Sequence, residues 1–280
     1  MREGKPSQTA AMVAFLRALA DLGVTSAKGF QDPTAQHLLP APWSQLLALF
    51  RRSARRRPLS ESLANARQGA DLLALRTLMI DAHLRDALAQ GARQVVILGA
   101  GLDGRAYRLR ELSDVRVFEV DHPSTQAWKR RRAAVLPVLA KSLTFVPVDF
   151  ERDSLDAALT QAGHEPGVPT VWLWEGVVMY LTSTAMRATL RVLAARSAAG
   201  STAIIQYNTR PSGPHALSLL LRFWKEPQIS LHTPEVIAAE LGAVGFHVSS
   251  DTGTDEWARR FDATSPGEMR QGARVVVARK

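Results

Sequence analysis

Gln-Val-Val-Ile-Leu-Gly-Ala-Gly-Leu-Asp-Gly-Arg-Ala-Tyr-Arg (residues 94–108) is the stretch that decides the fold of this chain. Its first part, Val95–Leu98, is a short apolar run rich in β-branched residues, which predicts a buried strand. Gly99, Gly101 and Gly104 follow at G-x-G-x-x-G spacing and favour a tight turn before a helix. Because such a backbone lets a ligand come close, the stretch predicts a nucleotide-binding turn, with a tight turn in another kind of α/β protein as the alternative.

An acidic residue, Asp121, follows the second predicted strand, which is the position of the ribose-binding acid in nucleotide sites. A second predicted strand, Val115–Val120, runs directly into Asp121. Asp121 follows Gly99 at about the 20-residue distance at which dinucleotide-binding folds place an acid on the ribose hydroxyls. The alternative for Asp121 is a helix cap before Pro123. Glu119 is expected to share the face of Asp121 and to have a supporting role.

The composition bounds the class of protein. The chain has 280 residues, 46% of them hydrophobic and 22% charged, which suits one large globular α/β domain with additions. No apolar run reaches the length of a membrane span, and no signal-peptide layout is visible, so a cytoplasmic location is expected. The absence of cysteine excludes disulfides, thiolate catalysis and cysteine metal sites. No His, Asp and Glu cluster has metal-ligand spacing, so no metal is predicted.

The net charge of +9 has two interpretations. It can mark an acidic partner, or it can reflect arginines spread along an ordinary globular chain. The densest cluster comprises Arg51, Arg52, Arg55, Arg56 and Arg57, and it lacks the interleaved aromatic residues typical of single-strand nucleic-acid binding. We therefore interpret the cluster as a solvated helix end and expect no nucleic-acid partner.

The order of predicted elements indicates an α/β fold. Residues 1–90 are expected to form a helical N-terminal cap, part of the same compact unit, with helices over 8–22, 43–56 and 60–90. Residues 91–280 are expected to form the core, with an insertion around 208–232 that faces the substrate. Its predicted strands are 95–98, 115–120, 143–148, 170–174, 202–206, 246–250 and 273–278, with helices over 123–140, 154–163, 184–198 and 233–241. Strands that alternate with helices predict a mostly parallel sheet covered on both faces. The last two strands lack a long crossover helix and are expected to pair antiparallel at the edge.

Four motifs, taken in order, resemble the leucine carboxyl methyltransferase-like family of class I S-adenosylmethionine-dependent methyltransferases. They are residues 96–108, Phe-Glu-Val-Asp-His-Pro (118–123), Val-Asp-Phe (148–150) and Glu-Gly-Val-Val-Met-Tyr-Leu (175–181). Asp32-Pro33 with Ala35, and Arg76-Thr77, are similar to the upstream signatures of the family. The resemblance implies a Rossmann-like seven-stranded sheet with an antiparallel last hairpin and a helical N-terminal cap.

The resemblance also implies a set of cofactor-binding residues. Glycine backbone would lie against the methionine part, Asp121 would hold the ribose, and Asp149 with Phe150 would contact the adenine. Glu175 would lie near the cofactor amino group, and Arg76 would pair with its carboxylate. The alternatives are a helix cap for Asp149, a surface role for Arg76 and an ordinary loop position for His122. The complete predicted set is Arg76, Gly99, Ala100, Gly101, Asp121, His122, Asp149, Phe150 and Glu175.

The expected activity is methyl transfer from S-adenosyl-L-methionine to a hydroxyl or carboxylate oxygen of a small organic metabolite, polyketide-type molecules being the bacterial case. The alternatives are methylation of a protein C-terminal carboxylate, an NAD(P)-dependent oxidoreductase, and a cofactor-binding protein without catalysis. A hydroxyl acceptor is helped by a general base. The candidate bases are Tyr180, Tyr207, His215 and His232, each with packing or surface exposure as its alternative. A monomer or a homodimer is expected.

Overall fold

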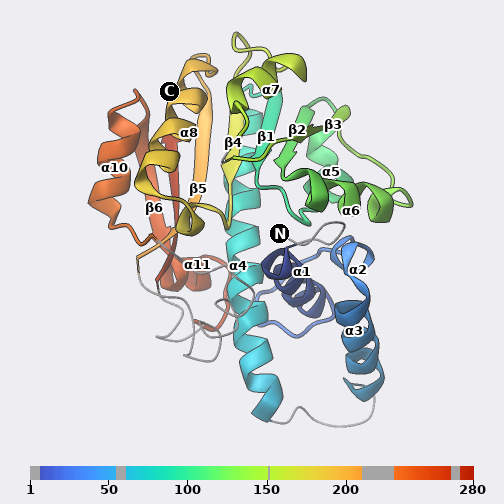
Figure 1. Ribbon diagram of the computed structural model, residues 1–280. Helices are drawn as coiled ribbons and strands as arrows, with labels where there is room; N and C mark the ends of the chain where they lie inside the picture. The colour runs from blue at the N-terminus through green and yellow to red at the C-terminus, as the bar shows by residue number, and fades with distance from the viewer. Residues whose placement is uncertain (1–6, 55–60, 151, 210–229, 266–271) are drawn as a thin grey trace.

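The centre of the protein is a seven-stranded sheet (Figure 1). The computed structural model describes residues 7–54, 61–150, 152–209, 230–265 and 272–280. The strands run in the order β3-β2-β1-β4-β5-β7-β6, and β7 is antiparallel to both of its neighbours while the remaining pairs are parallel. Their bounds are β1 (Gln94–Leu98), β2 (Arg116–Asp121), β3 (Ser142–Pro147), β4 (Thr170–Trp174), β5 (Thr202–Asn208), β6 (His247–Gly253) and β7 (Ala273–Arg279). The predicted fold class is confirmed.

The last two strands pair antiparallel, as expected, but a tight turn does not join them. A short helix, α11 (Thr254–Arg260), lies between them. Strand β7 inserts between β5 and β6, so that β6 alone forms this edge of the sheet. The insertion buries β7, whose Val275 and Val276 are fully covered, and this explains the apolar run 275–278 within the strand.

In the described part of residues 1–93, the helices that precede the first strand are α1 (Gln8–Asp21), α2 (Ala35–Leu38), α3 (Ala41–Ala54) and α4 (Glu61–Ala89). Figure 1 shows α1, α2 and α3 gathered at one end of the molecule, with α4 running from this cap along the sheet. Ser7 caps α1 by accepting a hydrogen bond from the Ala10 N–H, and Phe15 and Leu19 are buried on the inner side of the helix. The cap is thus packed onto the core.

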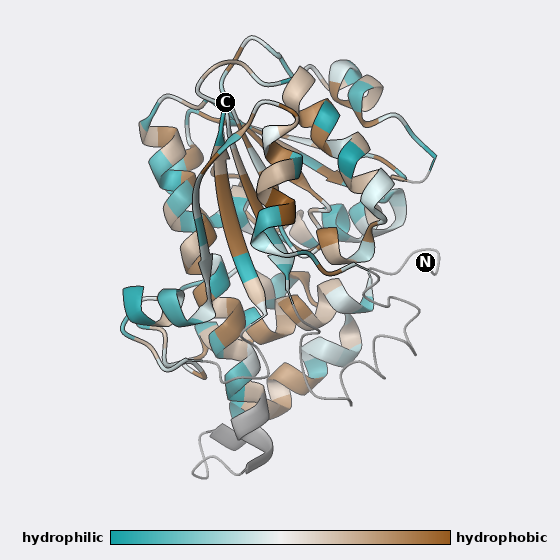
Figure 2. Cartoon of the chain, turned by 90° about the vertical axis from the view of Figure 1, so that its left-hand side faces the viewer, coloured by the Kyte–Doolittle hydropathy of each residue, from teal (hydrophilic) through white to brown (hydrophobic). Residues whose placement is uncertain are grey.

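Alternate residues of each strand face opposite layers of helices. Val95 and Ile97 belong to a core that includes residues of α1, α4, α6 (Pro123–Ala133) and α11. Val96 and Leu98 belong to a second core that includes residues of α7 (Leu155–Gln161), α8 (Ser183–Ala195) and α10 (Pro234–Gly242). Figure 2 shows the brown, apolar strands between helices that turn teal, polar residues outward. Burial on both faces explains why the central strands β1 and β4 are largely apolar runs.

Some boundaries differ from the predictions. The helix predicted over 123–140 ends at Ala133, where the Leu136 N–H bonds the Ala133 carbonyl in a turn and Pro137 supplies no N–H. The glycine turn leads into a single helical turn, α5 (Arg105–Arg108), followed by η1 (Arg110–Leu112). Most of the predicted 208–232 insertion lies outside the described residues. No helix within the described ranges combines the length and hydropathy needed to cross a membrane.

Candidate functional site

Three residues predicted for the site lie level with one another at the carboxyl edge of the sheet. Leu98, the last residue of β1, pairs with Val120 of β2 on one side and with Trp174 of β4 on the other. Ligands of open α/β sheets bind outside this edge. The next residue along each of the three strands therefore stands beside its neighbours, and these residues are Gly99, Asp121 and Glu175.

The glycine turn has a backbone that only glycine adopts readily. Gly99 has φ +64° and Gly101 has φ +48°, both in the left-handed region. A Cβ atom on Gly99 would lie 2.3 Å from Cγ2 of Val177, and one on Gly101 would lie 3.3 Å from Cβ of Ala10. Helix α1 of the cap therefore reaches the turn from one side. The glycines are required by both conformation and space.

Asp121 lies under the glycine turn. Its Oδ2 accepts the Gly101 N–H, and its Oδ1 accepts the His122 N–H at 2.6 Å. Burial raises the pKa of this carboxyl, while the two N–H donors act in the opposite direction. Asp121 is not the helix cap of the alternative interpretation, because His122 caps α6 by accepting the Ser124 N–H at Nδ1. A carboxylate has about four acceptor positions, so two remain for ribose hydroxyls.

The second acidic position, Asp149, follows β3 and is half-buried. Its Oδ2 lies 4.0 Å from Nε2 of His122, so the two predicted residues are neighbours. The residue that caps α7 is Ser154 rather than Asp149. Phe150 is half-buried and packs against the core under α7 and α8. The structure thus brings His122 and both acidic positions together along the ends of β2 and β3.

Arg76 and Glu175 form an ion pair at the end of β4. Nε of Arg76 donates to Oε1 of Glu175 at 2.8 Å, and the two side chains are only 10% and 14% exposed. Arg76 is therefore not an ordinary surface arginine. Burial alone would raise the pKa of Glu175, but Arg105 and Arg76 together lower it, so the carboxylate is ionised. Opposite charges side by side suit the carboxylate and ammonium groups of an amino acid.

Sequence reasoning missed a buried ionic network behind this pair. Arg105 is fully buried, and its guanidinium contacts Asp81 of α4, Asp103 of the glycine turn and Glu175. Arginine neighbours hold the pKa of Asp103 well below its usual range despite burial. The sequence held one indication of this network, because Asp81 interrupts an otherwise apolar part of the helix predicted over 60–90. The remaining members are Arg108, Asp32 and Arg17.

Glu119, which was expected to support Asp121, is almost completely buried. Its Oε2 lies 2.6 Å from Nζ of Lys129 on α6, and both side chains are 1% exposed. Burial raises the pKa of Glu119 to about 7, although Lys129 opposes the shift. The pair lies on the cap side of β2, beneath Asp121, and fastens α6 to the strand that carries the predicted ribose acid.

The candidate bases have different surroundings. Tyr207 is fully buried and donates its hydroxyl to Oδ2 of Asp251 at 2.6 Å, and burial together with Asp251 raises the pKa of the phenol. Tyr180 is half-buried at the end of η2 (Val178–Tyr180), shortly after Glu175. His232 is buried, which lowers its pKa, and its backbone N–H bonds the Asn208 carbonyl. His215 lies outside the described residues.

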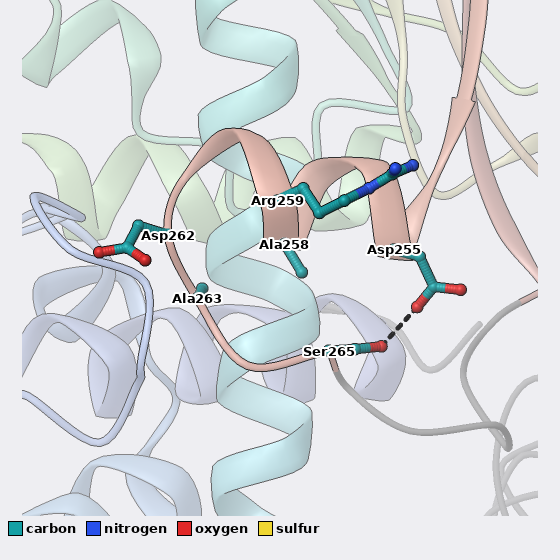
Figure 3. Close-up of a pocket in the computed structure, with 6 residues that line it drawn as sticks. All are labelled: Asp255, Ala258, Arg259, Asp262, Ala263 and Ser265. Carbon is teal, nitrogen blue, oxygen red and sulfur yellow. Dashed lines mark hydrogen bonds between the residues drawn. The ribbon is translucent and has the colours of Figure 1, made fainter.

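A surface hollow of about 470 Å³ lies beside α11. Figure 3 shows it, with Ser265 donating to Asp255 across its rim. None of the predicted cofactor residues lines it, so the hollow is separate from the candidate site. Its lining residues are Asp255, Ala258, Arg259, Asp262, Ala263 and Ser265.

The family of the chain follows from a sequence comparison. Residues 10–194 match the family described as leucine carboxyl methyltransferase, and this range contains every predicted cofactor residue. The chain belongs to the leucine carboxyl methyltransferase family. The predicted family is therefore confirmed, and the match reaches from α1 of the cap to α8 of the core.

Relatives of this leucine carboxyl methyltransferase family member include a Mycolicibacterium paratuberculosis protein named "Putative S-adenosyl-L-methionine-dependent methyltransferase". It is 37% identical over 204 residues, 69% of this chain and 64% of the relative, so the match spans less than two thirds of the relative. A DUF574 family protein from Streptomyces avermitilis superimposes with a TM-score of 0.60 at 15% identity, covering 99% of this chain and 98% of its own. Magnesium protoporphyrin IX methyltransferase from Synechocystis with bound SAH superimposes with a TM-score of 0.50 at 14% sequence identity. The superposition covers 85% of this chain and 95% of the methyltransferase chain. At these identities the structural likeness concerns the fold.

Proposed function

We propose that the chain is an S-adenosyl-L-methionine-dependent methyltransferase that methylates an oxygen atom of a small organic metabolite. The observation that carries the proposal is the alignment of the glycine turn, Asp121 and the Arg76–Glu175 pair along one edge of the sheet. Membership of the leucine carboxyl methyltransferase family and the names of the relatives support the cofactor.

The chemistry of the residues fits this cofactor. The backbone of Gly99, Ala100 and Gly101 faces the methionine part, since the left-handed conformations of Gly99 and Gly101 form a tight turn without side chains. Asp121, which is only half-buried as a residue, accepts the ribose hydroxyls. His122, Asp149 and Phe150 border the adenine. Arg76 binds the carboxylate of the amino acid part, and Glu175 binds its ammonium.

When bound, S-adenosyl-L-methionine supplies a methyl group that its sulfonium already activates. The protein therefore has to orient the acceptor in line with the sulfur–methyl bond and to exclude water, and orientation of this kind supplies roughly 7–11 kcal/mol. Helix α1 contributes to the exclusion of water, because it packs against the glycine turn. A carboxylate acceptor needs no base.

A hydroxyl acceptor is helped by a base, and the described candidates are not equivalent. Tyr207 donates to Asp251, so removal of its proton would place two negative charges side by side, which makes it a poor base. Burial lowers the pKa of His232, so its ring is neutral, and its Nε2 has no hydrogen-bond partner within the described residues; among the described candidates we therefore favour it. Tyr180, close in sequence to Glu175, is retained as a second candidate base.

The second candidate function is methylation of a protein C-terminal carboxylate, which the name of the family itself favours. Family membership argues against an NAD(P)-dependent oxidoreductase. The test is transfer of radiolabelled methyl from S-adenosyl-L-methionine to three acceptor classes: phenols, small carboxylic acids, and a peptide that ends in a leucine carboxylate. Label on a small acceptor alone supports the proposal, label on the peptide alone supports the second candidate, and cofactor binding without transfer to any acceptor contradicts both.

A further inference from the structure

A continuous series of buried charges links the end of β4 to the glycine turn through the cap. The series alternates in sign, and its side chains come from α1, α4, α5, the turn before α2 and the end of β4. In order of contact it comprises Glu175, Arg105, Asp81, Arg108, Asp32 and Arg17, and it ends on the carbonyl of Leu102.

The first half of the series has short contacts. Arg105 donates to Oε2 of Glu175 at 2.9 Å and to Oδ1 of Asp81 at 2.7 Å. The other oxygen of Asp81 lies 2.6 Å from Nη1 of Arg108. The exposed fractions of the Arg105, Asp81 and Arg108 side chains are 1%, 4% and 6%. Asp81 on α4 therefore joins Arg105, which touches the cofactor acid, to Arg108, which does not.

The second half returns to the glycine turn. Nε of Arg108 lies 3.9 Å from Oδ1 of Asp32, whose side chain is fully buried. Nη1 of Arg17 on α1 lies 3.3 Å from Oδ2 of Asp32, and Nη2 of Arg17 donates to the Leu102 carbonyl at 2.5 Å. Leu102 follows Gly101 directly, so the series closes on the same turn that carries the predicted cofactor backbone.

Buried ion pairs give little net stability, because removing charges from water costs about as much as their attraction returns. Their better attested effect is to fix geometry, since each charge must keep its partners. A site works when neighbouring residues lock its side chains in the productive arrangement. Here the locked parts are Glu175 and the glycine turn, which belong to different strands and flank the same end of the candidate site.

We propose that Arg108 is a positioning residue for the amino acid end of the cofactor, acting through Asp81 and Arg105 to hold Glu175 in register with the glycine turn. This inference rests on the proposed function, because it assumes that S-adenosyl-L-methionine occupies the site. Arg108 acts on the part of the site that binds the amino acid group, while Asp121 and Asp149, at the ends of β2 and β3, lie outside the series.

The test compares two ligands that differ only in the amino acid part. S-adenosyl-L-homocysteine carries it, and 5′-methylthioadenosine lacks it. Calorimetric dissociation constants are measured for the wild type, Arg108→Met and Arg108→Lys. We expect Arg108→Met to weaken the binding of S-adenosyl-L-homocysteine by about tenfold, while the affinity for 5′-methylthioadenosine changes by less than about twofold. Arg108→Lys should lose less affinity for S-adenosyl-L-homocysteine than Arg108→Met.

Two further variants separate positioning from folding. Arg196→Met removes a buried arginine that contacts Asp156 and His164 near Thr170, at the opposite end of β4 from Glu175, and is the matched control. It should lower stability and leave both ligands unaffected. Asp81→Asn keeps the shape of the side chain while removing its charge. The same two dissociation constants are measured for this variant, which replaces Arg108→Met if that variant does not fold. Asp81→Asn should show the same selective loss.

Each outcome decides the inference. A selective loss of affinity for S-adenosyl-L-homocysteine in Arg108→Met or Asp81→Asn supports the positioning role. Unchanged binding of both ligands, or an equal loss of both, overturns it, since a general structural role affects the two ligands alike. If the wild type binds neither ligand, the proposed function fails, and the positioning role fails with it.

Discussion

Nε of Arg76 lies 2.8 Å from Oε1 of Glu175, although the two residues are 99 positions apart in the sequence. Arg76 comes from the cap helix α4, and Glu175 follows the last residue of β4. The contact therefore joins the cap to the carboxyl edge of the sheet at one point. It also places a positive and a negative charge next to each other where the amino acid end of the cofactor is proposed to bind.

Arg76→Gln removes the positive half of this pair. Because charge-assisted hydrogen bonds contribute about 1.5–3 kcal/mol, we expect the affinity for S-adenosyl-L-homocysteine to fall roughly 10- to 100-fold. Calorimetric titration measures the change. The matched control is Arg85→Gln, which alters an arginine of the same helix that pairs with Glu111 at the surface. Equal affinity in Arg76→Gln and the control would remove Arg76 from the site.

Asp121→Ala is predicted to weaken cofactor binding sharply. The carboxylate is the proposed acceptor for both ribose hydroxyls, and it also receives the Gly101 N–H of the glycine turn. A loss of roughly 100-fold is expected from two charged hydrogen bonds and the released turn. Isothermal calorimetry with S-adenosyl-L-methionine checks this against Asp114→Ala, an exposed acid just before the same strand. Near-unchanged affinity in Asp121→Ala would overturn the ribose assignment.

Gly99→Ala is predicted to cost more stability than an ordinary glycine substitution. The alanine would have to adopt φ +64° and would place its Cβ 2.3 Å from Cγ2 of Val177. Gly245→Ala is the matched control, because Gly245 has φ +82° and no atom within 4 Å of an added Cβ.

We expect about 1 kcal/mol lost from the free energy of unfolding in the control, and about 2–3 kcal/mol lost in Gly99→Ala. Urea unfolding measures both values. Adding Val177→Ala should recover the difference between the two variants, since it removes the collision and leaves the backbone conformation unchanged. Equal losses at the two glycines would show that the turn has room for a side chain.

His164 makes the stability depend on pH. It is buried against Arg196, and burial with the charges of Arg196 and Arg116 lowers the pKa of the imidazole to about 4, from 6.5. Between these two values the unfolded chain binds a proton that the folded protein does not. Stability is therefore complete above pH 6.5 and falls as the pH drops towards 4, by up to about 3 kcal/mol.

The measurement is the free energy of unfolding in urea at several pH values from 7 to about 4.5. The quantity of interest is the difference between the wild type and His164→Gln, because this difference cancels the other titrating groups. We expect the variant to lose less stability than the wild type as the pH falls. His247→Gln, an exposed histidine, is the control. Parallel pH profiles for the wild type and His164→Gln would contradict a buried neutral imidazole.

Much of the fold was predictable because the apolar runs of β1, β2 and β4 each end next to a glycine or an acidic residue. Leu98 is followed by glycine, Val120 by Asp121 and Trp174 by Glu175. In parallel strands these terminal residues meet at one edge, so chain order alone brought most of the predicted cofactor residues together. The position of β7 between β5 and β6 was not predicted, because only the antiparallel pairing of the last two strands was considered. A clue was present, since the edge strand β6 is polar and largely exposed, whereas β7 carries the buried apolar run 275–278.

The ionic network escaped prediction for a different reason. A charged residue on a predicted helix usually faces solvent, and the sequence does not say which charges the packing of the cap will cover. Arg105 and Arg108 are close in sequence, but their partner Asp81 comes from α4, and Asp32 comes from the turn before α2. The clue was an acid among the apolar residues of α4, whose burial demanded a partner.

The most direct test of the proposed cofactor site is calorimetric titration of the purified protein with S-adenosyl-L-methionine, with NAD as the control ligand. We expect micromolar-range binding of S-adenosyl-L-methionine alone. Binding of NAD alone would contradict the methyltransferase site and assign the glycine turn to a dinucleotide.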